Sequence, residues 1–109
     1  MPSRSQEDEL LRRLRQGSCN ALDRLVNAHL RFVVIIASRA RTDELTLMDL
    51  IAEGTVGLIK GARDYDAIRH GSFTPHIVRR ARREIQRAIA RQRRRVRDDQ
   101  AMTARQEAS

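Results

Sequence analysis

A chain of 109 residues can form at most one small domain with a single modest core. Its formal net charge is +8, and all but one of its 22 basic residues are arginine, the exception being Lys60. A basic domain of this size is typical of proteins that bind nucleic acid or another polyanion. The single cysteine, Cys19, excludes an internal disulfide, and no apolar run is long enough to cross a bilayer. We therefore expect a soluble cytoplasmic protein with no membrane partner.

The apolar pattern divides the chain into three stretches. Residues 1–5 are polar and are expected to be disordered. Residues 6–95 hold every periodic segment and form the expected helical domain. Residues 96–109 show no apolar period, which predicts a disordered tail.

The first half of the domain predicts two helices. Leucines at 10, 11 and 14 indicate a short helix over residues 7–16, with Ser5 and Asp8 as a capping box and Gly17 as the stop. A longer helix is expected from Ser18, as N-cap, to about residue 41. Its predicted apolar face carries the following residues at helical spacing: Leu22, Leu25, Val26, His29, Val33, Ile36 and Ala40.

Residues 32–37 within this second helix are apolar on all sides. Alone they could form a buried strand, but the chain offers no second strand to pair with, so a helix is favoured. The pattern predicts that this helix is the central and most buried one. His29 is expected to be a packed or rim residue and not a metal ligand, because no Cys or His stands at metal-ligand spacing from it.

A third helix is predicted from Thr46, as N-cap, to about residue 65. Gly54 and Gly57 lie inside it, and each costs roughly 1 kcal/mol relative to alanine in a helix. We therefore expect another backbone to pack closely at this point. Asp49 and Glu53, one turn apart, place two carboxylates on a second face of the same helix.

The fourth helix has the strongest charge signal. Residues 66–72 contain Gly71 and are expected to form a loop, and Thr74 as N-cap with Pro75 at the first helical position predicts a helix to beyond Ile89. Its apolar stripe is Ile77, Ala81, Ile85, Ala88 and Ile89. Arginines cover the rest of the surface and would repel one another, which indicates an anionic partner and salt-dependent binding. The sequence thus predicts an all-α fold with a compact three-helix core and a short N-terminal helix.

No pattern in the chain points to catalysis. There is no phosphate-binding glycine loop, no plausible nucleophile pair and no metal cluster. Asp49 and Glu53 are the only candidate acid–base pair, and helical carboxylates one turn apart are usually a solvated face. We expect a protein that is not an enzyme and that needs no cofactor or metal.

Four blocks of the sequence resemble region 2 of the sigma-70 family of RNA polymerase sigma factors, in the family's order and spacing. They are residues 25–34, 49–58, 64–66 and 71–74. The most specific block is the string Asp-Leu-Ile-x-Glu-Gly-x-x-Gly-Leu at residues 49–58. The resemblance covers roughly residues 7–95 and implies the helical fold of sigma region 2.

The resemblance implies contact with core RNA polymerase as a partner. In the family, the helix that carries this string docks on the coiled coil of the largest clamp subunit. The matching positions in this chain are Asn27, Arg31, Asp49, Leu50, Ile51, Glu53 and Gly54.

The resemblance also implies contact with promoter DNA at the −10 element. Phe73 matches the leading phenylalanine of the segment that captures non-template bases, and His76 stands where the family usually has a base-stacking tyrosine. Arg83, Gln86 and Arg87 match positions that read the upstream duplex. With the neighbouring arginines, the implied DNA-binding residues are Phe73, His76, Arg79, Arg80, Arg82, Arg83, Gln86, Arg87 and Arg91.

Two departures from the family bear on function. Arg79 and Arg80 replace the Trp pair of primary sigma factors, which removes stacking of roughly 1–3 kcal/mol per base. The sequence also ends where the family continues toward the domain that reads the −35 element. We therefore expect either one half of a split sigma factor, whose second polypeptide supplies that domain, or a stand-alone regulator.

Three roles stay open at this point. They are a sigma-like initiation domain, a stand-alone basic nucleic-acid-binding regulator, and an antagonist that competes with a sigma factor for polymerase. An anti-sigma factor is a further candidate partner. In each case the expected location is the cytoplasm, in association with the nucleoid.

Overall fold

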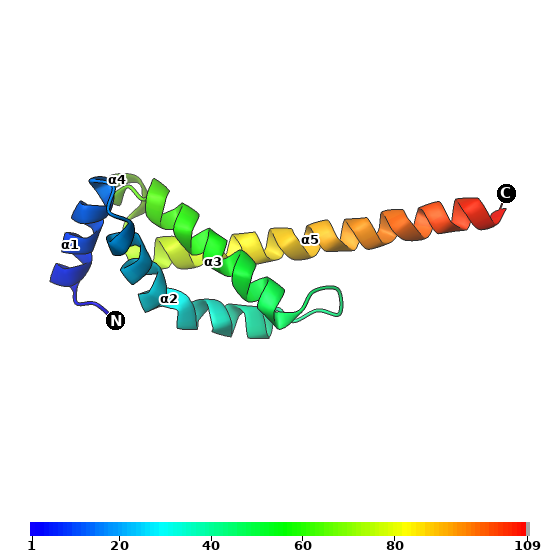
Figure 1. Ribbon diagram of the computed structural model, residues 1–109, viewed down its shortest axis with the longest axis horizontal. Helices are drawn as coiled ribbons and strands as arrows, with labels where there is room; N and C mark the ends of the chain where they lie inside the picture. The colour runs from blue at the N-terminus through cyan, green and yellow to red at the C-terminus, as the bar shows by residue number, and fades with distance from the viewer. Residues whose placement is uncertain (109) are drawn as a thin grey trace.

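The computed structural model describes residues 1–108, which form five α-helices and no strand. The helices are α1 (Arg4–Arg15), α2 (Cys19–Arg39), α3 (Leu47–Asp64), α4 (Ala67–His70) and α5 (Phe73–Ala108). The first four gather at one end of α5, and the remainder of α5 projects away from them (Figure 1). The molecule is accordingly elongated, at 65 × 23 × 23 Å. The predicted all-α fold is confirmed, with α2, α3 and α5 as its core helices.

Side-chain caps start the first three helices. Ser18 accepts a hydrogen bond from the backbone nitrogen of Ala21 at 3.2 Å, and Thr46 forms a capping box with Asp49. Both predicted N-caps are confirmed. The predicted capping box at Ser5 is wrong, because Ser3 and Gln6 form it instead, and α1 begins at Arg4. Ser5 is therefore helical.

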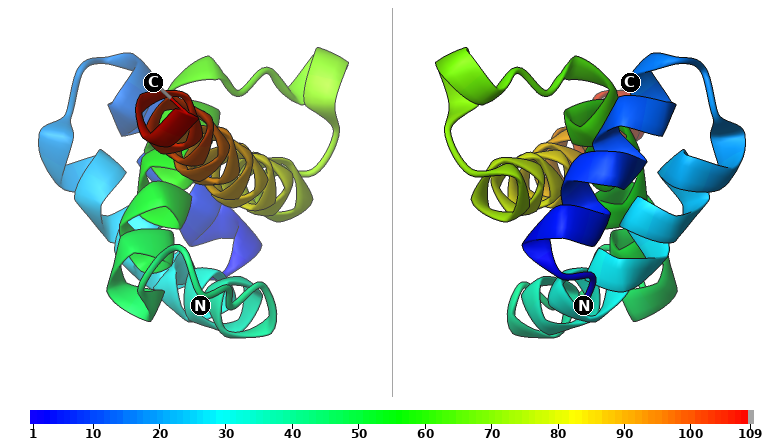
Figure 2. Two further views of the ribbon diagram at one scale, coloured as in Figure 1. Left: turned by 90° about the vertical axis from the view of Figure 1, so that its right-hand side faces the viewer. Right: turned by 90° about the vertical axis from the view of Figure 1, so that its left-hand side faces the viewer.

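The core lies where α3 packs between α5 and α2. The α3–α5 interface is the most extensive in the molecule, and α2 packs on both of these helices. Leu50 and Leu58 of α3 and Ile85 of α5 are fully buried in this core. Helix α1 packs on α2 at the end of the bundle away from the projecting part of α5 (Figure 2).

The prediction that the second helix is the central and most buried one is wrong. Val33 and Ala37 are fully buried, but Val34 is 42% exposed and Ile35 is 48% exposed. The physical reason is that α2 lies on the outside of the bundle, so only one of its faces is covered. The central helix is α3.

The segment that joins α3 to α5 also differs from the prediction. The expected loop contains α4, whose first turn is capped by Asp66 through a 2.9 Å hydrogen bond from the backbone nitrogen of Ile68. Gly71, at φ 72°, ends this short helix. Helix α5 then begins at Phe73, so the predicted N-cap role of Thr74 is wrong.

Helix α5 continues to Ala108, through most of the stretch for which the sequence predicted a disordered tail. Residues 93–108 contain neither glycine nor proline and are rich in arginine, alanine and glutamine. These residues have high helix propensity, so a helix can form here without an apolar face. Nearly all of their side chains are exposed.

Candidate functional site

The glycines of α3 let α5 and α2 approach it closely. A methyl group at Gly57 would lie 2.6 Å from the Cα of Ala81 and 2.6 Å from the carbonyl oxygen of Arg80. A methyl group at Gly54 would lie 2.6 Å from Val33 Cγ1 on α2. Such distances are too short for carbon contacts. The predicted close approach of another backbone is therefore confirmed at Gly57, whereas the close neighbours of Gly54 are side chains.

Only part of the predicted polymerase-binding string reaches the surface. Leu50 is fully buried, Gly54 packs against α2, and Ile51 is half-buried. Asp49 is exposed and Glu53 is half-buried. The buried members therefore hold the helix in place, and the two carboxylates are what a partner could contact.

Both carboxylates already have partners within the protein. Asp49 Oδ2 accepts a hydrogen bond from the backbone nitrogen of Thr46 at 3.1 Å. Glu53 Oε2 lies 3.4 Å from Arg91 Nη2 on α5, and both side chains are partly solvent-exposed. An ion pair in such a setting contributes about 0–1 kcal/mol, so a cation from a partner could compete for Glu53.

Apolar side chains that the sequence prediction missed extend this surface. Met48 is 72% exposed and Val56 is 41% exposed. Both residues lie outside the buried stripe of α3. Apolar residues at positions outside that stripe are the sequence feature that could have revealed this surface. We use the name α3 outer face for the accessible set formed by Met48, Asp49, Ala52, Glu53 and Val56.

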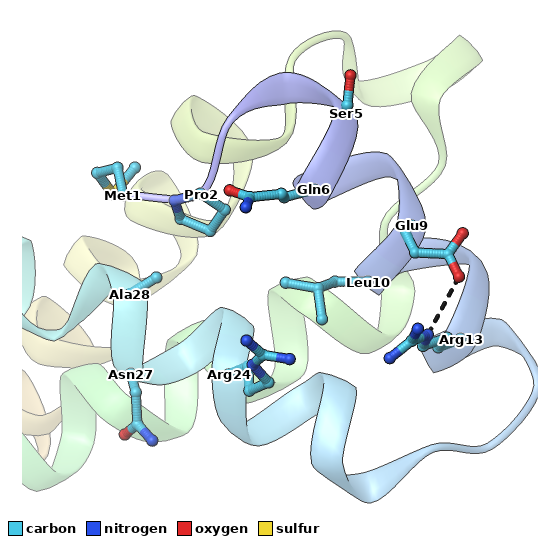
Figure 3. A pocket seen from close by; sticks show the side chains of 10 residues that line it. All are labelled: Met1, Pro2, Ser5, Gln6, Glu9, Leu10, Arg13, Arg24, Asn27 and Ala28. Atoms are coloured by element: carbon cyan, nitrogen blue, oxygen red, sulfur yellow. Dashed lines mark hydrogen bonds and ion pairs between the residues drawn. The ribbon is translucent and has the colours of Figure 1, made fainter.

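The two predicted polymerase-binding residues of α2 lie at a different level of the bundle. Asn27 and Arg31 are both exposed. Helices α2 and α3 are antiparallel, with Val33 against Gly54, so Arg31 lies about 3 Å and Asn27 about 9 Å along α2 from this contact. Both displacements lead away from Asp49. Asn27 borders an open groove of about 800 Å³ between α1 and α2, and its amide points away from α1 (Figure 3).

The two side chains predicted to capture bases are buried. Phe73 is 2% exposed, and its ring makes edge contacts with Tyr65 and His29, at centroid distances of 5.0 and 5.8 Å. His76 is 6% exposed and stacks on His70 with centroids 4.1 Å apart. Because protein atoms cover both rings, neither can stack on a base in this conformation.

His29 links the second and fifth helices from inside the core. Its side chain has no exposure, and Nε2 lies 2.9 Å from Thr74 Oγ1, while Nδ1 lies 2.7 Å from the carbonyl oxygen of Leu25. The prediction of a packed histidine is confirmed, and both of its ring nitrogens have hydrogen-bond partners.

Asp64 joins the end of α3 to the start of α5. It accepts a hydrogen bond from His76 Nε2 at 3.0 Å and another from the Arg80 guanidinium. Burial acts to raise the pKa of Asp64, but the hydrogen bonds from His76 and Arg80 outweigh it and hold that pKa below its usual 3.8. Arg80 therefore belongs to the α3–α5 interface and does not extend freely from the surface.

The other members of the predicted DNA-binding set are exposed on α5. We use the name α5 basic face for Arg79, Arg82, Arg83, Gln86, Arg87 and Arg91. Arg87 lies 3.8 Å from Glu84, and Arg91 pairs with Glu53. Within residues 1–108, no carboxylate lies within 4 Å of the cationic nitrogens of Arg79, Arg82 and Arg83.

A groove beside this face brings in residues that the sequence prediction missed. It has a volume of about 300 Å³ and lies between α2 and α5, with Arg82 and Gln86 on the α5 side. Phe32, Ile35 and Arg39 line the α2 side. The groove therefore adds one further cation and one half-buried aromatic ring to the α5 basic face.

Two other classes of site find no support among the residues that the structure describes. None of the helices is long and apolar enough to cross a membrane. No three His, Cys, Asp or Glu side chains of residues 1–108 gather in a way that could hold a metal ion.

The fold and these surfaces define a small helical bundle with an acidic, partly apolar helix face close to an arginine-rich one. The family model of sigma-70 region 2 matches residues 25–95, which is most of the chain. The chain belongs to the sigma-70 region 2 family.

Curated relatives agree with this assignment. The chain is 40% identical to the RNA polymerase sigma factor SigA1 of Synechococcus elongatus, over 83% of this chain and 22% of the relative. It is 38% identical to the RNA polymerase sigma-B factor of a Nostoc species, over 84% of this chain and 27% of the relative. It is 39% identical to the RNA polymerase sigma factor SigA of a Bacillus species, over 87% of this chain and 25% of the relative. The chain thus spans about a quarter of the length of these relatives.

Proposed function

We propose that the chain is a sigma-factor domain that acts in transcription initiation. It binds core RNA polymerase with the α3 outer face, helped by Asn27 and Arg31, and promoter DNA near the −10 element with the α5 basic face. The observation that carries this proposal is the match of residues 25–95 to sigma-70 region 2. The string at residues 49–58 supports the polymerase contact, because its two carboxylates and the neighbouring Met48 and Val56 are accessible.

A pull-down with core polymerase tests the polymerase contact. The variant Asp49→Asn with Glu53→Gln removes both charges and keeps an oxygen at position 49 that can accept the Thr46 cap hydrogen bond. The matched control, Glu9→Gln with Asp23→Asn, makes the same change of charge on α1 and α2. We expect the first variant to bind core polymerase about tenfold more weakly than the control does. Equal capture of the two variants would contradict the polymerase contact.

The DNA contact is proposed for the α5 basic face only, because Phe73 and His76 are covered in this conformation. A forked template with a −10-like sequence and a scrambled one of equal length separate specific from general binding. Tighter binding of the −10-like fork supports the proposal. The burial of Phe73 and His76 favours a second candidate, a basic module that binds DNA without sequence preference. Equal affinities with a steep salt dependence would establish it.

Transcription in vitro decides between an initiation domain and an antagonist. The reaction contains core polymerase and a promoter, and it is run with and without an added polypeptide that carries a −35-reading domain. An initiation domain raises promoter-specific transcripts when it is added. A fall in transcripts made by a complete sigma factor would identify an antagonist.

A further inference from the structure

One face of α2 carries apolar and basic side chains that the other helices cover only in part. We use the name α2 strip for six residues of this face, each of them exposed or half-buried: Arg24, Ala28, Arg31, Phe32, Ile35 and Arg39. At 100° per residue they fall within an arc of about 100°, and they extend for about 22 Å along the helix. Ile35 lies near the middle of this arc and is 48% exposed.

The α2 strip borders an open groove at each of its ends. At the N-terminal end, Arg24 and Ala28 line the groove of about 800 Å³ between α1 and α2 (Figure 3). At the C-terminal end, Ile35 and Arg39 line the groove of about 300 Å³ between α2 and α5. The strip therefore connects two hollows of the surface.

The residues of the strip are spaced like the contact seam of a coiled coil. Ala28, Phe32, Ile35 and Arg39 follow one another in steps of four, three and four residues, which is the spacing of the a and d positions of a heptad. In this register, Arg24 and Arg31 occupy the g positions beside the seam. Such a seam packs against a second helix with the same repeat, and about four turns of that helix would match its length.

The charge of the α2 strip defines the sign of a partner. Among residues 1–108, no carboxylate lies within 4 Å of the cationic nitrogens of Arg24, Arg31 or Arg39. Asp23, the one carboxylate of α2, lies about 120° around the helix from Ile35. The strip is thus uniformly positive, so carboxylates that flank an apolar seam would complement it.

A single strand of nucleic acid fits the α2 strip less well than a helix does. Single-strand sites offer aromatic rings on which successive bases stack, whereas Phe32 is the one aromatic ring of the strip. The guanidinium of Arg31 lies over that ring, 5.6 Å from its centroid. The other apolar side chains of the seam are aliphatic. These observations favour a protein helix.

We propose that the α2 strip is a docking site for an amphipathic helix of another protein, with apolar residues at its a and d positions and carboxylates at e and g. The apolar side chains of that helix pack on the seam, and its carboxylates pair with the arginines of the strip. The strip shares only Arg31 with the residues proposed to bind polymerase. This inference goes beyond the proposed function, and its test needs neither polymerase nor DNA.

Binding of designed peptides to the full chain tests the proposal. The acidic peptide has three heptads with leucine at a and d and glutamate at e and g, and the basic peptide has lysine in place of each glutamate. Because like charges at e and g repel one another, each peptide disfavours pairing with itself. Fluorescence anisotropy of the labelled peptide measures its affinity for the chain.

A charge variant and its control separate the strip from the general positive charge of the chain. The charge variant is Arg24→Gln, Arg31→Gln, Arg39→Gln. The control loses the same net charge from exposed positions of α1 and α3, through Arg4→Gln, Arg15→Gln, Arg63→Gln. Glutamine is close to arginine in helix propensity, so the helices are retained in both.

A seam variant and its control test the apolar contact. Ile35→Gln places a polar group in the seam. Val34→Gln is the matched control, because Val34 is 42% exposed and lies about 100° around the helix from Ile35. Both residues are partly exposed, so neither substitution opens a cavity in the core.

We expect the charge variant and the seam variant each to bind the acidic peptide about tenfold more weakly than its control does. The basic peptide should not bind. Equal affinity of either strip variant and its control would overturn the proposal. Equal binding of the acidic and basic peptides would also overturn it, because apolar adhesion alone would then explain the binding.

Two other occupants have their own signatures. If a single-stranded oligonucleotide lost affinity in both strip variants while the acidic peptide did not bind, the strip would be a nucleic-acid site and the proposal would be wrong. If sedimentation equilibrium showed that the chain alone is a dimer, and that Ile35→Gln dissociates it, a second copy would be the occupant. That result would likewise overturn docking of another protein.

Discussion

At the scale of single residues, Gly57 sets the distance between α3 and α5. Its Cα faces the backbone of α5, where the nearest atoms belong to Ala81 and to the carbonyl group of Arg80. Backbone cannot move aside as a flexible side chain can. At Gly61, one turn later, an added methyl group would lie 3.1 Å from Cγ of Arg80, and 3.2 Å from both the Cβ of Arg80 and the Cα of Ile77.

This contrast predicts different effects of adding one methyl group. Gly57→Ala would force α3 and α5 apart and lower the free energy of unfolding by about 1–3 kcal/mol. At Gly61 the contacts are longer, and the gain in helix propensity of roughly 1 kcal/mol offsets part of their cost, so Gly61→Ala is expected to destabilise the fold less than Gly57→Ala does. Urea unfolding followed by circular dichroism measures both values. A loss at Gly61 equal to that at Gly57 would show that the two sites are equally crowded.

Asp64 makes stability depend on pH. Its folded-state pKa lies below the usual 3.8, because the hydrogen bonds from His76 and Arg80 outweigh the effect of burial. A carboxyl group with a lowered pKa stabilises the fold above its unfolded pKa, and this contribution disappears as pH falls through the folded pKa. We therefore expect the Asp64 contribution to be complete above about pH 5 and to be lost below 3.8.

Unfolding of matched variants at several pH values checks this expectation. Asp64→Asn removes the charge, so its free energy of unfolding should fall less steeply with acid than that of the unmodified chain. Asp23→Asn, which removes an exposed carboxylate on α2, should retain the steep fall. Parallel curves for the two variants would mean that other groups cause the acid sensitivity.

At the scale of helices, the sequence correctly predicted the N-caps that depend on local hydrogen bonds. It wrongly predicted the N-cap of α5, where a contact that depends on the fold decides. Ser18 and Thr46 were predicted as N-caps, and each bonds a backbone nitrogen three residues later. Thr74 has the same chemistry, but its hydroxyl reaches His29, which is 45 residues away in the sequence. Periodicity does not reveal such a contact, because only the packing of α2 on α5 brings the two side chains together.

The burial of α2 likewise could not be predicted from sequence periodicity. The apolar stretch at residues 32–37 carries no information on how many other helices will pack against it. In the structure, Val34 and Ile35 are exposed to solvent. The glycines of α3 were a better guide to the central helix. Close packing is the usual reason to retain glycine within a helix, and α3 is packed on two sides.

The two halves of α5 should differ in local stability. Its first half is anchored in the core by side chains such as Ile77 and Ile85, whereas side chains of residues 98–108 are exposed. Isolated helices shorter than about 12–15 residues are marginal in water. We expect native-state hydrogen exchange to show protection near the global value around Ile85 and almost none at residues 98–108. Uniform protection along α5 would mean that a second molecule covers the projecting end.

At the scale of the whole molecule, the candidate polymerase and DNA surfaces are adjacent. The α3 outer face and the α5 basic face meet at the ion pair between Glu53 and Arg91. A shallow groove at this junction is lined by Asp49 and Glu53 from one helix and by Arg91 and Arg95 from the other. Asp49 and Glu53 on one helix, and Arg91 on another, were predicted from the sequence as members of separate candidate sites. Their contact could not be predicted, because it depends on the antiparallel packing of α3 on α5.

The shared ion pair couples the two proposed binding events. Arg91 cannot pair fully with both Glu53 and a phosphate. A polymerase cation that pairs with Glu53 therefore makes Arg91 more available to DNA. Coupling between two sites is reciprocal, so bound DNA also makes Glu53 more available to polymerase. An exposed pair is worth about 0–1 kcal/mol, which limits the effect to roughly fivefold in affinity.

The variant Glu53→Gln measures this coupling without polymerase. It releases Arg91 and should tighten binding to a forked DNA by about two- to fivefold. Glu9→Gln makes the same change of charge on α1, where Glu9 pairs with Arg12 and Arg13. If general electrostatics alone were responsible, the two variants would tighten binding equally, and anisotropy titrations at matched salt would show it. A larger gain for Glu53→Gln, abolished when Arg91→Gln is added, would assign the effect to the ion pair and connect the two faces.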